Sequence, residues 1–189
     1  MKNPFIRTAI LGGLAAGLTC FLYLVILYTF GANPFGRYKY MYLGLYAVFF
    51  GGALWFFRFK LNSGKLPTGK ALGIGLMLNV TASLLYGILL YIWMLMPQFD
   101  VIDRHQKALE ELQQNNIAYL EQQMEASQQM EDLQAYENLE EQKQDMEIAF
   151  KKMKEDPLTA GVLAVDQTIG LLLIGVFLAF LTALIFKSR

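Results

Sequence analysis

Four long apolar stretches constrain this sequence more than any other feature. A bilayer core about 30 Å thick needs roughly 20 apolar residues of helix. Four segments meet or approach that length, at residues 9–30, 41–57, 71–96 and 162–186. All five prolines lie at or just outside the segment edges, where a missing N–H does not interrupt a helix. The sequence therefore predicts an all-α integral membrane protein with four transmembrane helices.

The ends of these segments carry further signals. The second segment has only 17 residues, and aromatic side chains flank it like an interfacial belt. These are Tyr38, Tyr40, Tyr42, Tyr46 and Trp55. Asp156 followed by Pro157 predicts a helix N-cap and first helical position for the last span. The first segment could instead be a signal peptide, but its 22 apolar residues exceed a typical h-region, so we expect it to be retained.

The acidic residues are confined to one part of the chain. All 16 of them fall between Asp100 and Asp166, and residues 1–99 contain none. The segment 98–157 carries 15 acidic and six basic residues, a net charge of −9. Such an uneven distribution indicates that the apolar segments and this acidic segment face different environments.

The acidic segment is expected to be helical. It lacks glycine and internal proline, and it is rich in Glu, Gln, Lys, Leu and Met, which favour helices. Apolar residues recur at spacings of three, four and seven without a sustained heptad. Because the fourth span must begin where the third ended, we expect an antiparallel helical hairpin, with its corner near Asn115-Asn116, Ser127 or Gln134.

This interpretation divides the chain into three parts. Residues 1–97 hold the first three spans, 98–157 form the extramembrane hairpin between spans three and four, and 158–189 hold the last span and a basic tail. Four retained spans place both termini on one side of the membrane.

Lysine and arginine predict which side that is. The two tails and the second loop carry eight bases, against Arg37 and Lys39 in the first loop. The excess favours cytoplasmic termini, and an extracytoplasmic hairpin, in a bacterial inner membrane. Counting the flanks of the third loop raises the outer total from two to seven. The acids in that loop still favour the outside, because a negative interior opposes them by about 2.3 kcal/mol per charge per 100 mV.

No catalytic constellation is evident. Residues 64–71, GKLPTGKA, resemble a phosphate-binding loop but end in Ala71, where Ser or Thr is needed, and no strand is predicted before them. His105 is the only histidine and is expected to be solvated; Cys20 is the only cysteine. We expect no enzyme activity and no metal, cofactor, nucleotide or nucleic acid.

Small and polar residues recur every four positions in three of the spans. In the third span they are Ala71, Gly75, Asn79, Ser83 and Gly87; in the first Ala9, Gly13 and Gly17; and in the last Gly175, Ala179 and Ala183. Small residues let helices approach closely in lipid, and an amide can hydrogen-bond across the contact. The pattern predicts helix-packing seams.

Asp166 and Asn79 are the candidate intramembrane polar site. Asp166 is the only ionisable residue inside a span, and such residues mark transport pathways when they lie at depth. As the fifth residue of its span it can instead reach the headgroup region. A small transporter or channel subunit using Asp166 and Asn79 is therefore the alternative function.

Several short motifs resemble a known family. They are Lys2-Asn3-Pro4 with Arg7, Gly69-Lys70-Ala71 leading into Gly75, Asp156-Pro157-Leu158, and the span from Gly175 to Ala183 with its basic tail. Over nearly the whole chain they resemble domain-of-unknown-function family 4199, uncharacterised small four-span membrane proteins of Bacteroidota. The resemblance implies an inner-membrane location and this layout. It assigns no activity and no catalytic residues, and the third loop here is longer than expected.

The leading hypothesis is a non-enzymatic inner-membrane protein. Its four-helix anchor would present the 98–157 hairpin for docking or assembly, either with another protein or with a second copy of the chain. An exposed, acidic hairpin dotted with methionines is longer than a link between two spans requires, and methionines adapt to varied partners. A merely solvated cap remains the simpler interpretation of the same segment.

Overall fold

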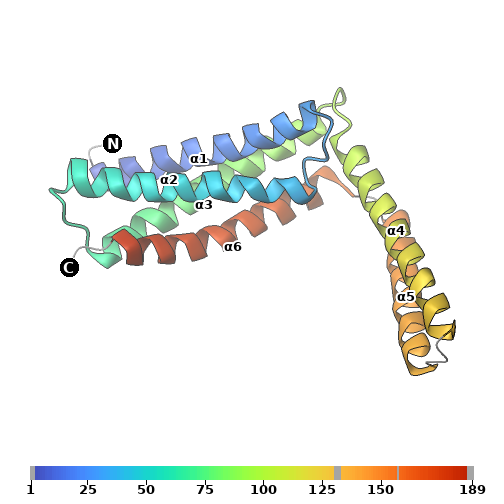
Figure 1. Cartoon of the computed structure of the whole chain (residues 1–189). Helices are drawn as coiled ribbons and strands as arrows, with labels where there is room; N and C mark the ends of the chain where they lie inside the picture. The colour runs from blue at the N-terminus through green and yellow to red at the C-terminus, as the bar shows by residue number, and fades with distance from the viewer. Residues whose placement is uncertain (1–2, 130–132, 157, 187–189) are drawn as a thin grey trace. The chain divides into compact units, whose positions relative to one another are not determined.

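The computed structural model describes residues 3–129, 133–156 and 158–186, and all regular secondary structure in these ranges is helical (Figure 1). The elements are α1 (Pro4–Thr29), the 3₁₀ turn η1 (Arg37–Met41), α2 (Tyr42–Phe56), the π turn η2 (Phe57–Leu61), α3 (Thr68–Leu95), α4 (Val101–Gln129), α5 (Leu133–Glu155) and α6 (Ala160–Phe186). They form two compact units. We call α1, α2, α3 and α6 the bundle, and α4 with α5 the acidic pair.

Each bundle helix is long and apolar enough to cross a membrane. Helices α1, α3 and α6 contain 26, 28 and 27 residues. The second segment, short in the sequence, is extended at both ends by η1 and η2, so that Arg37–Leu61 is helical over 25 residues. The four predicted spans therefore coincide with four helices of sufficient length.

Helix α1 begins with a capping pattern that was not predicted, whereas the helix start predicted at Asp156 is absent. The side chain of Asn3 accepts a 3.0 Å hydrogen bond from the Phe5 amide, with Pro4 as the first helical residue of α1. The last span, however, begins at Ala160. The Asp156 amide donates to the Lys152 carbonyl, 2.9 Å away, so Asp156 closes the end of α5 and the predicted N-cap is wrong. Pro157 lies outside the described residues.

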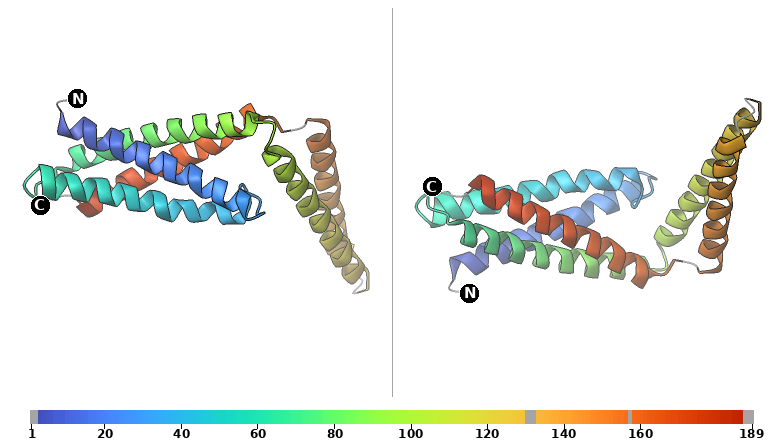
Figure 2. Two further views of the ribbon diagram at one scale, coloured as in Figure 1. Left: turned by 90° about the horizontal axis from the view of Figure 1, so that it is seen from above. Right: turned by 90° about the horizontal axis from the view of Figure 1, so that it is seen from below.

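Helix α3 packs against both α1 and α6, and α2 covers the remaining side of α1 and α6 (Figure 2). Glycines allow the closest contact with α1. A Cβ atom added at Gly13 would lie 2.7 Å from the Leu78 carbonyl oxygen, and one at Gly17 would lie 2.5 Å from the Ala82 carbonyl oxygen. The two backbones are therefore too close for any larger residue.

In the acidic pair, α4 and α5 lie side by side and run in opposite directions (Figures 1 and 2). The Gln113 side-chain amide donates to the Met146 carbonyl at 3.3 Å, and the Lys143 ammonium lies 2.7 Å from a Glu121 carboxylate oxygen. Asn115 and Asn116 lie within α4, so the corner predicted there is wrong. Helix α4 ends at Gln129 and α5 begins at Leu133, close to the corners predicted near Ser127 and Gln134, and residues 130–132 lie outside the described residues.

The less exposed positions of the pair follow a heptad that apolar residues alone do not reveal. On α5 they include Tyr136, Leu139, Lys143, Met146, Phe150 and Met153. On α4 they include Gln106, Leu109, Gln113, Asn116, Leu120, Gln123 and Ser127. Both rows alternate spacings of three and four, as in a coiled coil. The apolar residues alone show no sustained heptad because polar side chains occupy most of the α4 row.

The close approach of α1 and α3 is testable with a single methyl group. Gly17→Ala should destabilise the protein by about 1–3 kcal/mol, because overpacking moves a neighbouring backbone. Gly44→Ala is the matched control, since a Cβ at Gly44 would meet nothing within 4 Å. Thermal unfolding in mild detergent measures both variants, and equal stability would refute the contact.

The Lys143–Glu121 pair predicts a pH-dependent contribution to the acidic pair. The hydrogen bond to Glu121 raises the pKa of Lys143 above its ordinary value of 10.5. The raised value means that the pair stabilises the fold below pH 10.5 and loses this effect as the pH rises through the raised pKa. We expect Lys143→Gln to lower the melting temperature of α4 and α5 at pH 7. Above the raised pKa of Lys143, the variant and the unaltered protein should melt at the same temperature. Far-UV circular dichroism measures the melting.

Lys151→Gln provides the control, because Lys151 is exposed and lies 4.0 Å from Glu155 on the same helix. A loss of the same size in both variants would show that the contact between helices adds nothing.

Candidate functional site

The small-residue positions of α3 and α6 lie opposite one another. A Cβ added at Gly75 would lie 2.9 Å from the Ala179 Cβ. One added at Gly87 would collide with the Thr168 hydroxyl, and one added at Gly175 would collide with the Asn79 side chain. Ser83 and Ala183 are buried in the same bundle, and Ala183 packs near Ala71 and Ile74. The Asn79 side chain thus occupies the space that a side chain at residue 175 would fill.

Asn79 joins three helices through its amide. Its side chain is 1% exposed, and its Oδ1 accepts hydrogen bonds from the Tyr46 hydroxyl at 2.8 Å and from the Ser83 hydroxyl at 3.3 Å. Its Nδ2 donates to the Leu172 carbonyl oxygen at 2.8 Å. The amide therefore links α2, α3 and α6, and its oxygen already has two donors.

Two further tyrosines lie near this junction, and the sequence interpretation assigned one of them a different role. The rings of Tyr42 and Tyr86 are 6.0 Å apart, and both are buried. The Tyr86 hydroxyl has no hydrogen-bond partner among the described residues. Tyr42 and Tyr46 were expected in the interfacial belt; they are buried instead, while Tyr38 and Tyr40 are exposed.

The signal that could have identified this junction is the spacing of its polar residues. Asn79, Ser83 and Tyr86 are spaced by four and three residues. This spacing places them on one face of α3. Tyr42 and Tyr46 are likewise four apart on α2. Polar faces on two adjacent spans predict a hydrogen-bonded contact between them. An interfacial aromatic belt, in contrast, consists of residues at the ends of the spans.

Asp166 is not part of the Asn79 junction. It is exposed on α6, and it accepts a 2.9 Å hydrogen bond from the Gln167 side-chain amide. The Gln167 oxygen in turn accepts one from the Lys39 ammonium at 3.3 Å. Leu172, to which Asn79 is bonded, lies six residues farther along α6, a rise of about 9 Å. The structure thus separates the two residues of the candidate polar site.

The remaining sequence candidates lie in unrelated places. Residues 64–71 follow the π turn η2, not a strand, and the Arg58 guanidinium donates to the Gly64 carbonyl at 2.9 Å. His105 is 8% exposed, so the solvated position expected for it is wrong. Within the described ranges, no three His, Cys, Asp or Glu side chains gather as metal ligands would. The best-organised polar group is therefore the Asn79 junction, whose geometry suits helix association.

The junction predicts opposite results for two conservative substitutions. Tyr46→Phe should cost about 0.6 kcal/mol, the average for hydrogen bonds between helices in a membrane protein, and no more than the maximum of about 1.7 kcal/mol. Tyr86→Phe should be neutral or stabilising, because it removes a buried hydroxyl without a partner. Unfolding free energies in mixed micelles compare the two variants. A larger loss for Tyr86→Phe would contradict the assignment.

Comparison with known proteins places the chain by sequence. No curated protein and no solved structure matches it. A family model described as "Protein of unknown function (DUF4199)" matches residues 12–188. The match covers nearly the whole chain and confirms the family resemblance, so this protein belongs to the DUF4199 family.

Proposed function

We propose that this protein is a non-enzymatic, multi-pass protein of a bacterial inner membrane that docks another protein through its acidic pair. The bundle is the anchor, and the acidic pair extends on the extracytoplasmic side. The observation that carries the proposal is the surface of α4. Leu112 and Tyr119 are 56% and 60% exposed and lie seven residues apart, on one face of the helix.

The contact between α4 and α5 is largely polar, so a partner would stabilise the pair. Its α4 row contains three glutamines, an asparagine and a serine, and α5 has no fully buried residue. Helices of this length gain most of their stability from tertiary packing. A pair with so polar an internal contact is therefore stabilised when a further surface covers Leu112 and Tyr119.

The charge distribution supports the proposed orientation. Arg58, Lys60, Lys65 and Lys70 surround the link between α2 and α3, whereas the acids gather in 98–157. Basic loops are retained in the cytoplasm. A net charge of −9 on the acidic segment also favours a partner with a basic surface, since complementary charge accelerates association.

The alternative function, a small transporter or channel subunit, gains less support from the geometry. A polar pathway requires groups that follow one another across the bundle. Asn79 is engaged with Tyr46, Ser83 and Leu172, and Asp166 lies exposed on α6. Two separate residues with different surroundings do not form a relay.

The docking role predicts face-specific crosslinking in native membranes. A photoreactive residue replacing Tyr119 should capture the partner, or a second copy of the chain if the assembly is homomeric. The same residue replacing Glu125 is the control, since Glu125 is exposed but lies about 120° away around α4. Crosslinked bands are identified by mass spectrometry.

A second arm separates docking from transport. Leu112→Ser should abolish the Tyr119 crosslink, whereas Asp166→Asn should leave it intact. Capture of the same bands from Tyr119 and Glu125, or no capture from either, would exclude the docking role.

A further inference from the structure

A groove of about 620 Å³ lies between the first half of α1 and the second half of α2. It extends from Pro4 to Gly12 along α1, eight residue steps or about 12 Å. Its lining is mainly apolar and includes Thr8, Leu11, Val48, Gly52 and Phe56. Val48 is 70% exposed, so the groove opens along the side of the bundle.

Small residues create this groove. A Cβ added at Gly52 would meet nothing within 4 Å, so the space beside this glycine is empty. Gly12, across the groove, is packed against Leu78 and Ala53 beneath it. The Thr8 hydroxyl donates to the Pro4 carbonyl at 2.9 Å, so this polar group is occupied within α1. The groove therefore suits a hydrocarbon chain.

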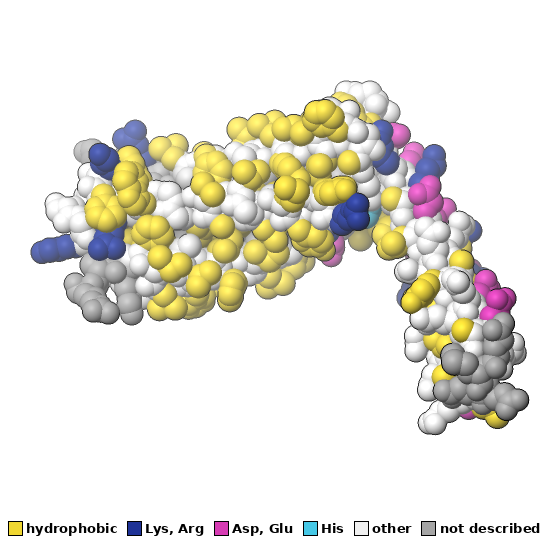
Figure 3. Space-filling model, in the orientation of Figure 1, with side chains coloured by type: hydrophobic (Ala, Val, Ile, Leu, Met, Phe, Trp, Pro, Cys, Tyr) yellow, Lys and Arg dark blue, Asp and Glu magenta, His cyan; other side chains and the backbone are white. Residues whose placement is uncertain are grey.

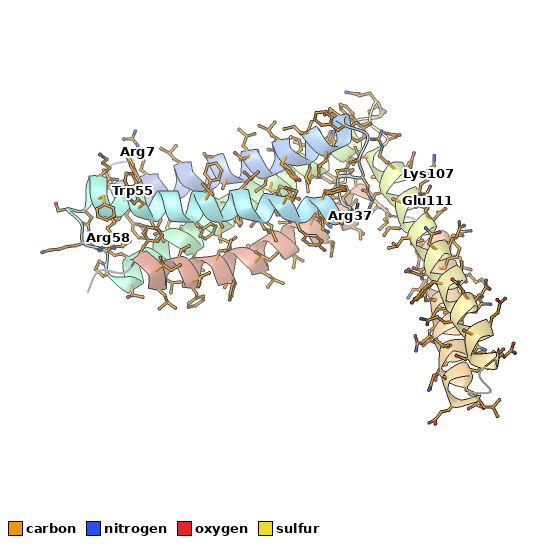
Figure 4. All side chains as sticks on the ribbon, in the orientation of Figure 1. Arg7, Arg37, Trp55, Arg58, Lys107 and Glu111 are labelled. Carbon is orange, nitrogen blue, oxygen red and sulfur yellow. The ribbon has the colours of Figure 1, made fainter. Side chains whose placement is uncertain are left out.

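Arg7 lies at one end of the groove. It is exposed, and among the described residues no carboxylate lies within salt-bridge distance of it. Arg58, which lies at the same end of the bundle (Figure 4), already donates to the carbonyls of Gly64 and Phe186. Arg7 is thus the guanidinium left to bind an anion beside the groove.

The end of the bundle that carries Arg7 is basic. Figure 3 shows lysine and arginine side chains there without acidic ones on the visible face, next to an apolar side. Residues 1–99 contain no acid to compete for Arg7. By the positive-inside rule this end faces the cytoplasm, where the leaflet carries anionic lipids.

We propose that the groove binds an anionic phospholipid, with one acyl chain between α1 and α2 and the headgroup phosphate on Arg7. Arginine pairs with phosphate through two parallel hydrogen bonds. An apolar groove with one cation at its end matches the two chemical parts of such a lipid. The site is independent of the docking role and requires that the bundle lie in a bilayer with its Arg7 end at a leaflet that carries anionic lipids.

The test uses the full-length protein and two lipids with identical acyl chains. Native mass spectrometry after extraction from vesicles of phosphatidylglycerol and phosphatidylcholine should show preferential retention of phosphatidylglycerol. Arg7→Gln should weaken this retention about tenfold, because a charged hydrogen bond is lost. Arg37→Gln is the control, since Arg37 belongs to η1 at the opposite end.

A second pair of variants tests the acyl-chain groove. Gly52→Leu should fill the space and reduce retention, while Gly44→Leu, also on α2 and equally open, should not. The melting temperatures of both variants, compared with that of the unaltered protein, show whether they fold.

Three results would overturn the site. Equal retention of the two lipids by the unaltered protein is one, and it needs no variant. Equal effects of Gly52→Leu and Gly44→Leu are another. The third combines two observations: millimolar inorganic phosphate displaces phosphatidylglycerol completely, and Gly52→Leu has no effect on its retention. Together they would show an anion site that does not bind an acyl chain.

Discussion

The bundle depends on two close approaches to helix α3. On one side, Gly17 of α1 lies against the Ala82 carbonyl, and on the other, Gly75 lies against Ala179 of α6. At such distances dispersion contacts accumulate along the whole helix, and this term drives association where an apolar solvent offers no hydrophobic gain. Helix α2 then occupies the remaining side, with Tyr46 reaching Asn79. Because Asn79 also bonds to α6, one amide fixes the relative heights of three helices.

Much of this architecture could be predicted from the sequence, because its determinants are local. Segment length and proline position identified the four spans, and helix-forming composition identified the acidic helices. The predictions failed where a neighbouring element decides the outcome. Tyr42 and Tyr46 were expected in a belt, yet both are buried and contact Tyr86 and Asn79 of α3. Asp156-Pro157 has the pattern of a helix start, but the preceding helix continues to that point.

The candidate site shows the same division. The spacing of Gly75, Asn79, Ser83 and Gly87 identified the face of α3 that meets α6, since a period of four is visible in one helix alone. The pairing of Asn79 with Tyr46 was not visible, because it joins residues 33 positions apart. Asp166 and Asn79 share a polar character but not a location. The prediction of one polar site therefore joined two residues that lie in different parts of the bundle.

The long separation of α3 and α6 along the sequence has a consequence for biosynthesis. Asn79 and the Leu172 carbonyl that it binds are 93 positions apart. At about 5–20 residues per second, the ribosome adds Leu172 roughly 5–20 s after Asn79, and the hydrogen bond cannot form earlier. Until α6 is made, Gly75 of α3 lacks the Ala179 side chain that it packs against, and the Asn79 amide lacks the Leu172 acceptor. Most of the residues between Asn79 and Leu172 belong to the acidic segment, so a change in its length alters this delay while leaving every bundle contact unchanged.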